Sequence, residues 1–163
     1  MSELAYLSLG SNIGDREEHL NHAITELSSL GKVKSISSFY ETDPVEFVQQ
    51  PTFLNCVVAL QTDLSPMELM NQVLNIERRL GRQRTQKKGP RTLDIDILLY
   101  GDRVIESADL TIPHPAMAQR RFVLLPLAEI AAAVNHPVLH KTARELLDQL
   151  PAGQNVWKFC KSQ

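Results

Sequence analysis

Two carboxylates, Asp94 and Asp96, lie inside one of the most apolar stretches of the chain, which reads Gly-Pro-Arg-Thr-Leu-Asp-Ile-Asp-Ile-Leu-Leu-Tyr over residues 89–100. Side chains two residues apart on a strand project from the same face, so these acids would lie side by side, roughly 6.5 to 7 Å apart at the backbone. Their repulsion, on the order of 2 to 3 kcal/mol at an effective dielectric of about 20, would be removed by a hard, oxygen-preferring dication. The pair predicts a divalent metal site, with a sheet-edge pair neutralised by Lys or Arg as the alternative.

A cluster of positive charge directly precedes this acidic strand and contains no acid. Arg91 follows a Gly-Pro turn and offers a planar donor that suits phosphate. Cations and a metal together can share the charge of a triphosphate, so the position next to the acids favours a polyphosphate site over a solvated basic loop. The cluster consists of Arg82, Arg84, Lys87, Lys88 and Arg91.

Other side chains in the sequence are candidates for a binding site. Glu77 lies at the edge of a helical apolar stripe and either approaches the acids or forms an exposed pair with a neighbouring Arg. Phe53 and Phe122 could stack on a flat ring while Asn55 hydrogen-bonds its edge, although aromatic residues are more often core. His114, between two prolines, could donate a hydrogen bond to phosphate.

Two further patterns are weak as functional motifs. Gly10-Ser11-Asn12 with Gly14 lacks the spacing of a glycine-rich phosphate loop and is interpreted as a turn. His136 and His140 have a zinc-compatible spacing only on a helix, which Pro137 disfavours.

The bulk composition is that of an ordinary globular protein. The 163 residues are 43% hydrophobic and 22% charged, with a net charge of −2. We therefore expect one domain over residues 1–163, no membrane insertion and no general nucleic-acid binding. The first ten residues show no signal-peptide pattern and the two cysteines form no disulfide framework, so we predict a cytoplasmic protein.

Hydrophobic periodicity predicts an alternation of strands and helices up to residue 100. The expected strands are 4–9, 33–40, 53–60 and 93–100, and the expected helices are 15–30 and 65–80. The order β-α-β-β-α-β predicts an α+β fold with a ferredoxin-like core, in which an antiparallel sheet carries both helices on one face. A turn at 101–102 should lead into a further strand at 104–105, and a C-terminal extension follows, less regular from 110 but with a helix near 142–150.

These residues together resemble a known enzyme family. The run 89–98 with Gly10-Ser11-Asn12, Phe53-Leu54-Asn55, Glu77, Arg82, Pro113-His114, Arg120 and Phe122 is similar to 6-hydroxymethyl-7,8-dihydropterin pyrophosphokinases of folate biosynthesis. The resemblance extends from about residue 4 to residue 130, and the arginine-to-double-aspartate run is its most specific part.

The resemblance implies a reaction and its participants. Such an enzyme transfers diphosphate from ATP, its co-substrate, to the hydroxymethyl group of the dihydropterin, giving AMP and the pterin diphosphate ester. Two Mg²⁺ ions would be held by Asp94 and Asp96, and the enzyme is expected to be a monomer. The open alternatives are a Mg-dependent nucleotidyltransferase, or a non-catalytic ferredoxin-like module that binds RNA or a small ligand.

The resemblance also assigns roles to individual residues. The implied catalytic residues are Arg82, Arg91, Asp94 and Asp96. The implied ATP-binding residues are Glu77, Arg82, Arg84, Lys87, Arg91, Ile97, His114 and Arg120. The implied pterin-binding residues are Thr42, Pro44, Val45, Phe53, Asn55 and Phe122.

Overall fold

The computed structural model of the protein describes residues 2–43, 52–81 and 92–160. The elements in chain order are β1 (Glu3–Ser11), α1 (Arg16–Leu27), β2 (Lys32–Ile36), β3 (Tyr40–Thr42), β4 (Phe53–Thr62), α2 (Pro66–Gly81), β5 (Asp94–Tyr100), β6 (Ile105–Glu106), β7 (Thr111–Ile112), the 3₁₀ turn η1 (Met117–Gln119), α3 (Arg121–Ala131), α4 (Ala143–Asp148) and β8 (Val156–Lys158). Within these ranges no helix combines the length and apolar character needed to cross a membrane.

The main sheet is antiparallel and has the strand order β5-β1-β4-β3-β8, with β2 also pairing with β4. Its first strands connect through α1 and α2 in the predicted β-α-β-β-α-β order, with β2 and β3 together in the place of the second strand. This arrangement confirms the predicted α+β, ferredoxin-like core.

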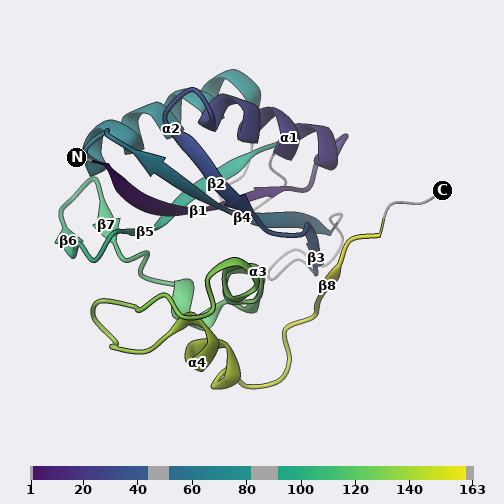
Figure 1. Ribbon diagram of the computed structural model, residues 1–163. Coiled ribbons are helices and arrows are strands. Elements are labelled where there is room, and N and C mark those ends of the chain that lie inside the picture. Colours follow the sequence, from purple (N-terminus) through teal and green to yellow (C-terminus); the bar gives the residue numbers. More distant parts are fainter. Residues whose placement is uncertain (1, 44–51, 82–91, 161–163) are drawn as a thin grey trace.

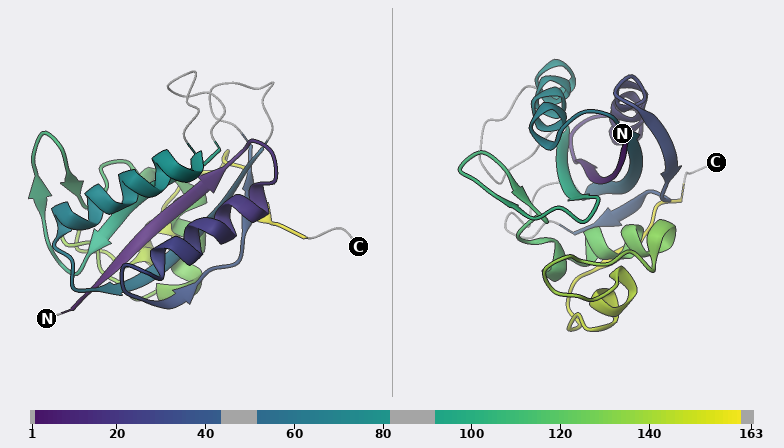
Figure 2. Two further views of the ribbon diagram at one scale, coloured as in Figure 1. Left: turned by 90° about the horizontal axis from the view of Figure 1, so that it is seen from above. Right: turned by 60° about the vertical axis from the view of Figure 1, so that its left-hand side comes forward.

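The helices form two layers, one on each face of the sheet. Figure 1 shows α1 and α2 on one face and α3 and α4 on the other. Figure 2, seen from above, shows α1 and α2 side by side along the strands. Because both faces are covered, β4 is buried through most of its length, which explains its near-continuous apolar sequence.

Alternate residues along the central strands pack into two separate hydrophobic cores, one on each face of the sheet. The core under α1 and α2 takes Leu7, Leu9, Leu54, Cys56, Val58, Leu60, Ile95 and Ile97 from the strands. The core against α3 and α4 takes Tyr6, Val57, Ala59, Leu98 and Leu99. Leu98 and Leu99 therefore point to the same side, because the β1–β5 register shifts between Tyr6 and Leu7. This is a β-bulge.

Capping residues start both helices of the first layer where the sequence predicts. Ser65 and Glu68 form a reciprocal pair, in which each backbone N–H donates to the other side chain, at 2.8 and 3.2 Å. Asp15 caps α1 by accepting a hydrogen bond from the N–H of Glu18 at 3.1 Å. Helix α1 ends at Leu27 instead of continuing to residue 30, and the hydroxyls of Ser28 and Ser29 donate to carbonyl oxygens of its last turn.

The first two predicted strands need correction. The strand 4–9 extends through Gly10 and Ser11, so the predicted turn at Gly10 is wrong. The strand 33–40 is broken into β2 and β3. Between them the hydroxyl of Ser37 accepts the N–H of Val57 at 2.9 Å, so a side chain substitutes for a ladder carbonyl.

The region after residue 100 also differs from expectation. The predicted strand 104–105 exists as β6 but pairs with β7 and not with β5. Helix α3 was not predicted, because Pro126 lies inside it and proline argues against a helix. Helix α4 confirms the predicted helix near 142–150, whereas β8 was not predicted and adds an edge strand beside β3.

Candidate active site

Three neighbouring strands bring predicted metal and pterin residues onto one face of the sheet. Gly10 of β1 pairs with Asp94 of β5 on one side and with Asn55 of β4 on the other. This face is the one toward α3, since Ile95 packs in the opposite core. With strands about 4.8 Å apart, the Cα atoms of Asp94 and Asn55 are separated by about 10 Å. Asp96 lies on the same face, opposite Ser8.

Gly10 leaves space in the middle of this row. A Cβ atom at this position would lie 2.8 Å from Nδ2 of Asn55 and 3.9 Å from Cδ1 of Phe53. Any side chain here would therefore intrude on the side chains that β4 presents. Sequence reasoning missed this role because the glycine was interpreted as part of a turn.

A pocket of about 340 Å³ opens at the β5 edge of the sheet. Helix α2, strand β5, the β6–β7 hairpin and the segment after it contribute its walls. The lining residues are Met70, Val73, Leu74, Glu77, Asp94, Ile95, Asp96, Ile97, Asp109, Leu110, Thr111, His114 and Pro115. The lining therefore combines apolar side chains with a group of acids, and it includes the predicted nucleotide-side residues Glu77, Ile97 and His114.

Glu77 contacts the acidic strand directly. Its Oε2 accepts a hydrogen bond from the backbone N–H of Ile95 at 2.6 Å. Among the described residues, β5 is at the edge of the sheet, so an outward-facing N–H there has no strand partner within this part of the chain and needs another acceptor. Glu77 therefore anchors the segment that carries Asp94 and Asp96 to α2.

His114 presents a nitrogen to the acid pair. Its backbone N–H donates to the carbonyl oxygen of Leu98 at 3.0 Å, and its Nδ1 accepts the N–H of Ala116 at 3.1 Å. Nε2 then carries the proton of the neutral ring and lies 4.0 Å from Oδ1 of Asp96. Burial, together with the charge of Arg120, lowers the pKa of His114 despite an opposing effect of Asp94. The imidazole is therefore a neutral donor near neutral pH.

The described residues contain no group of three or more His, Cys, Asp or Glu side chains placed to hold a metal alone. The acid pair nevertheless fits Mg²⁺, because this ion is usually bound by one or two carboxylates together with substrate phosphates and waters. Asp96 is 39% exposed, so its oxygens are accessible from the pocket side.

Of the predicted pterin residues that the structure describes, Asn55 and Phe53 lie beside Gly10, and Phe122 packs against the core under α3 and α4. Oγ1 of Thr42 donates to Oδ1 of Asn55 at 2.9 Å, and both side chains are buried. This bond fixes the orientation of the Asn55 amide. Phe53 and Phe122 are partly exposed, and the guanidinium of Arg120 lies 5.5 Å from the centroid of the Phe122 ring. Arg120, which was predicted to bind phosphate, therefore lies over the ring of Phe122, which was predicted to bind the pterin.

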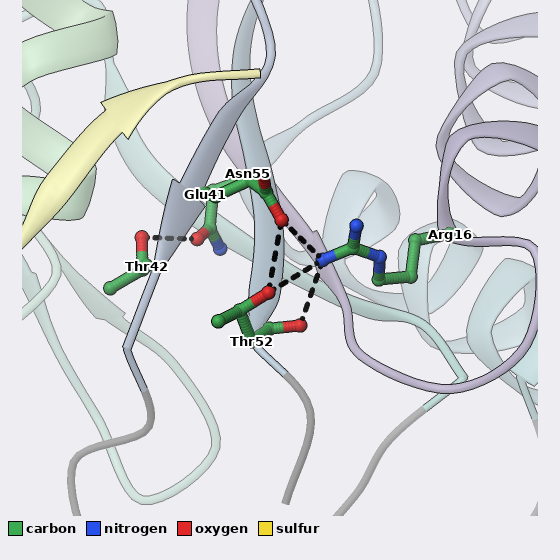
Figure 3. A network of polar contacts seen from close by, with 5 residues as sticks. All are labelled: Arg16, Glu41, Thr42, Thr52 and Asn55. Atoms are coloured by element: carbon green, nitrogen blue, oxygen red, sulfur yellow. Dashed lines mark hydrogen bonds and ion pairs between the residues drawn. The ribbon is translucent and has the colours of Figure 1, made fainter. Parts of the chain in front are cut away.

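A polar network that sequence reasoning missed connects α1 to the strands on this side (Figure 3). Nη1 of Arg16 pairs with Glu41 at 3.0 Å and donates to the hydroxyl and carbonyl oxygens of Thr52 at 2.9 and 3.0 Å. Thr52 also donates to Glu41 at 3.0 Å. The network fixes the residues adjacent to Thr42 and Phe53. No spacing rule indicates it, because its members are far apart in sequence.

Several predicted site residues lie outside the described residues. These are Pro44 and Val45 of the pterin set, and Arg82, Arg84, Lys87 and Arg91 of the phosphate set. Their assigned roles stay predictions.

Comparison with known proteins identifies the family. The model of the family described as 7,8-dihydro-6-hydroxymethylpterin-pyrophosphokinase (HPPK) matches residues 6–132. A Bacillus subtilis protein named 2-amino-4-hydroxy-6-hydroxymethyldihydropteridine pyrophosphokinase is 46% identical over 160 residues, which cover 97% of this chain and 92% of that protein.

Other relatives are much longer than this chain. The folic acid synthesis protein fol1 of Schizosaccharomyces pombe is 43% identical over 153 residues, which are 93% of this chain but 21% of that protein. The chain likewise spans 24% of the FOL1 protein of Dictyostelium discoideum, at 39% identity over 95% of this chain.

A solved structure shares the fold. The crystal structure of Plasmodium falciparum HPPK-DHPS with pteroate has a TM-score of 0.72 and 18% identity, and covers 91% of this chain and 42% of that chain. Membership of the family is shown by the sequence comparisons, because the family model matches residues 6–132 and the Bacillus subtilis relative is matched over 92% of its length. The chain therefore belongs to the 7,8-dihydro-6-hydroxymethylpterin-pyrophosphokinase family.

Proposed function

We propose that the protein transfers diphosphate from ATP to the hydroxymethyl group of 6-hydroxymethyl-7,8-dihydropterin, giving AMP and the pterin diphosphate ester, a step in tetrahydrofolate biosynthesis. Family membership supports this activity. The structural observation that carries it is the row Asp94–Gly10–Asn55, which sets the acid at the pocket beside a candidate ring-binding side chain on the same face.

The pocket at β5 is the proposed ATP site. Its apolar side chains, which include Met70, Leu74 and Ile97, suit the adenine ring, because burial against them removes the ring from water. Its acids include Asp94, which pairs with Gly10 of the pterin row, and they suit the metal-bound triphosphate. His114 would donate from Nε2 to a phosphate oxygen, since a neutral donor adds a hydrogen bond without a charge.

Asp94 and Asp96 would hold magnesium, and we propose two ions. When bound, magnesium supplies positive charge that neutralises phosphate oxygens and favours attack at phosphorus. The two carboxylates orient this charge from the sheet, and Glu77 keeps their strand in place through the N–H of Ile95.

The pterin would lie over Gly10, between the rings of Phe53 and Phe122. Stacking fixes the plane of the ring, and hydrogen bonds to Asn55 fix its rotation. Because Thr42 already donates to Oδ1 of Asn55, the amide is oriented before the ligand arrives. In this arrangement the pterin hydroxymethyl group would lie on the Asp94 side of the row.

In the proposed reaction the hydroxymethyl oxygen attacks the β-phosphorus of ATP. The bond from that phosphorus to the α–β bridging oxygen breaks, AMP leaves with the electron pair, and the hydroxyl proton passes to solvent. Arg82 and Arg91, predicted from the sequence, would balance the charge that develops on the phosphates.

The test is product identification. The protein is incubated with ATP, Mg²⁺ and 6-hydroxymethyl-7,8-dihydropterin, and the products are identified by ³¹P NMR and mass spectrometry. We expect AMP and the pterin diphosphate in equal amounts, with ATP intact when the pterin is omitted. Free pyrophosphate with an adenylylated pterin would contradict the proposal and indicate nucleotidyl transfer.

We also propose a single-domain, monomeric and cytoplasmic protein, as the sequence predicts. Size-exclusion chromatography with light scattering tests the monomer, and a molecular mass twice that of the 18.3 kDa chain would refute it.

A further inference from the structure

The segment at 154–155 contacts two parts of the chain that flank the proposed pterin site. Figure 1 shows the chain passing from α4 to β8, which lies beside β3. The family model matches residues 6–132, so this segment lies beyond the part of the chain that the model describes.

Gln154 caps the start of α3. Its Oε1 accepts the N–H of Arg121 at 2.7 Å, and its Nε2 donates to the carbonyl oxygen of Gln119 at 2.9 Å. The first N–H groups of a helix have no partner within the helix, and the N-cap residue Arg120 makes no capping side-chain bond. Gln154 therefore supplies from a distance the cap that the local sequence lacks.

The next residue holds the other side of the site. Nδ2 of Asn155 donates to Oδ2 of Asp43 at 3.0 Å, and its carbonyl oxygen accepts the N–H of Asp43 at 3.4 Å. Asp43 follows Thr42, whose hydroxyl orients Asn55. Gln154 and Asn155 are adjacent in the chain, so their Cα atoms are about 3.8 Å apart. This short fixed distance links the contact at the start of α3 to the contact at Asp43.

The opposite end of α3 has its own attachment to β3. Glu129 accepts hydrogen bonds from the hydroxyl of Tyr40 at 2.7 Å and from the hydroxyl of Ser38 at 2.8 Å. Since that end is held independently, loss of Gln154 would loosen mainly the N-terminal turn, which carries Phe122.

We propose that Gln154 is a positioning residue for pterin recognition, which holds Phe122 at a fixed distance from the Thr42–Asn55 pair. The inference rests on the proposed function, because it assigns Phe122 to the pterin. A ring with two side-chain torsions follows its backbone closely, whereas the guanidinium of Arg120 can compensate for a small backbone shift through its longer side chain. Gln154 should therefore affect the pterin more than the nucleotide.

The experiment compares Gln154→Met, which keeps the size but loses both hydrogen bonds, with wild type. Binding of 6-hydroxymethyl-7,8-dihydropterin is measured by calorimetry at saturating non-hydrolysable ATP analogue and Mg²⁺, and binding of the analogue is measured alone. We expect the pterin Kd to rise about tenfold, since a side chain must be ordered again on binding. The Kd of the ATP analogue should change less than about twofold, because Arg120 can compensate for a small backbone shift.

Two further variants separate positioning from general destabilisation. Gln154→Glu keeps the acceptor for the Arg121 N–H and should restore most of the pterin affinity. Gln149→Met removes a comparable exposed bond to Lys141, at 2.9 Å, and should bind the pterin like wild type.

Unchanged pterin binding by Gln154→Met, or equal weakening of pterin and analogue, would overturn the positioning role while leaving the proposed function intact. Absence of pterin binding by the wild type would overturn both.

Discussion

Gly10 contributes to the candidate site because it has no side chain to occupy the space next to Asn55 and Phe53. The atoms nearest to a methyl group added at this position would be Nδ2 of Asn55, the carbonyl oxygen of Leu54 and Cδ1 of Phe53, all from β4. The space beside Asn55 is therefore set by a residue on the neighbouring strand. The glycine separates the acid pair from the pterin residues without filling the gap.

Substitution Gly10→Ala should weaken pterin binding selectively. The new methyl group would meet Asn55 at 2.8 Å, and overpacking of this kind costs about 1 to 3 kcal/mol. We expect the pterin Kd, measured with saturating ATP analogue, to rise about tenfold or more. The analogue's own affinity serves as the control, and an unchanged pterin Kd would show that the space beside Asn55 is not used.

Substitutions Asp94→Ala and Asp96→Ala should remove most turnover and leave the fold intact. Each lost carboxylate holds metal and does not fill a core, so we expect Mg²⁺-dependent AMP release to fall at least about 100-fold. Circular dichroism should show a thermal midpoint close to that of wild type. Asp102→Ala, at the exposed turn after the same strand, is the matched control. Wild-type AMP release by either pocket variant would refute the metal assignment.

Residues on regular strands were predictable, whereas residues that act through long-range contacts were not. Asp94, Asp96 and Asn55 follow the two-residue period of a strand, so their shared faces could be deduced from spacing. Arg16 and Gln154 reach partners more than thirty residues away, at Thr52 and Gln119, and no local pattern indicates such a bond.

At the scale of elements, the part of the chain up to residue 100 was the more predictable. Helix α2 starts at a capping box that can be identified in the sequence, and β4 alternates between two cores. Helix α3 was missed because Pro126 obscures its periodicity, and β8 because a three-residue strand exists only through its pairing with β3. Short elements depend on tertiary contacts more than on propensity.

The connection from α3 to α4 is organised by a buried histidine. Nδ1 of His136 accepts the backbone N–H groups of Val138 and Leu139 at 3.2 and 3.1 Å. Burial lowers the pKa of His136 below its ordinary value of 6.5, with a smaller contribution from the charge of His140. The fold therefore requires the neutral ring.

Stability should fall in mild acid because of this histidine. With a depressed folded-state pKa, the unfolded chain binds the proton first, so the stabilisation is complete above about pH 6.5 and is lost as pH falls through the folded-state pKa. His136→Asn keeps an acceptor near the Nδ1 position but cannot titrate. Urea unfolding between pH 7.5 and 5 should show a smaller loss for the variant than for wild type. His114 titrates in both proteins, so its contribution cancels in this comparison. An equal loss of unfolding free energy with falling pH in the two proteins would contradict the prediction.

At the scale of the whole molecule, one sheet serves two hydrophobic layers. Leu20 of α1 and Leu127 of α3 are both fully buried, each in the core of its own face. Because the same strands contribute to both cores, neither layer can be removed without exposing the sheet. We therefore expect the molecule to unfold as one cooperative unit, as a single domain would.

Substitutions Leu20→Ala and Leu127→Ala should each lower the free energy of unfolding by about 2 to 5 kcal/mol. Both should still give a single transition, with circular dichroism and the fluorescence of the only tryptophan, Trp157, changing together. Two separate transitions in the Leu127→Ala variant would show that α3 and α4 form an independent layer.

The bulge in β5 imposes a rule on chain length. It turns Leu99 to the same side as Leu98, so that Tyr100 returns to the α2 side, where its hydroxyl donates to the carbonyl oxygen of Leu64. A chain one residue shorter between Asp96 and Tyr100 keeps both on these faces only if the bulge is lost, because regular alternation then sets them on opposite faces. Homologues that keep both should therefore have either this length with the bulge or one residue fewer without it, which an alignment of the family together with its structures can check.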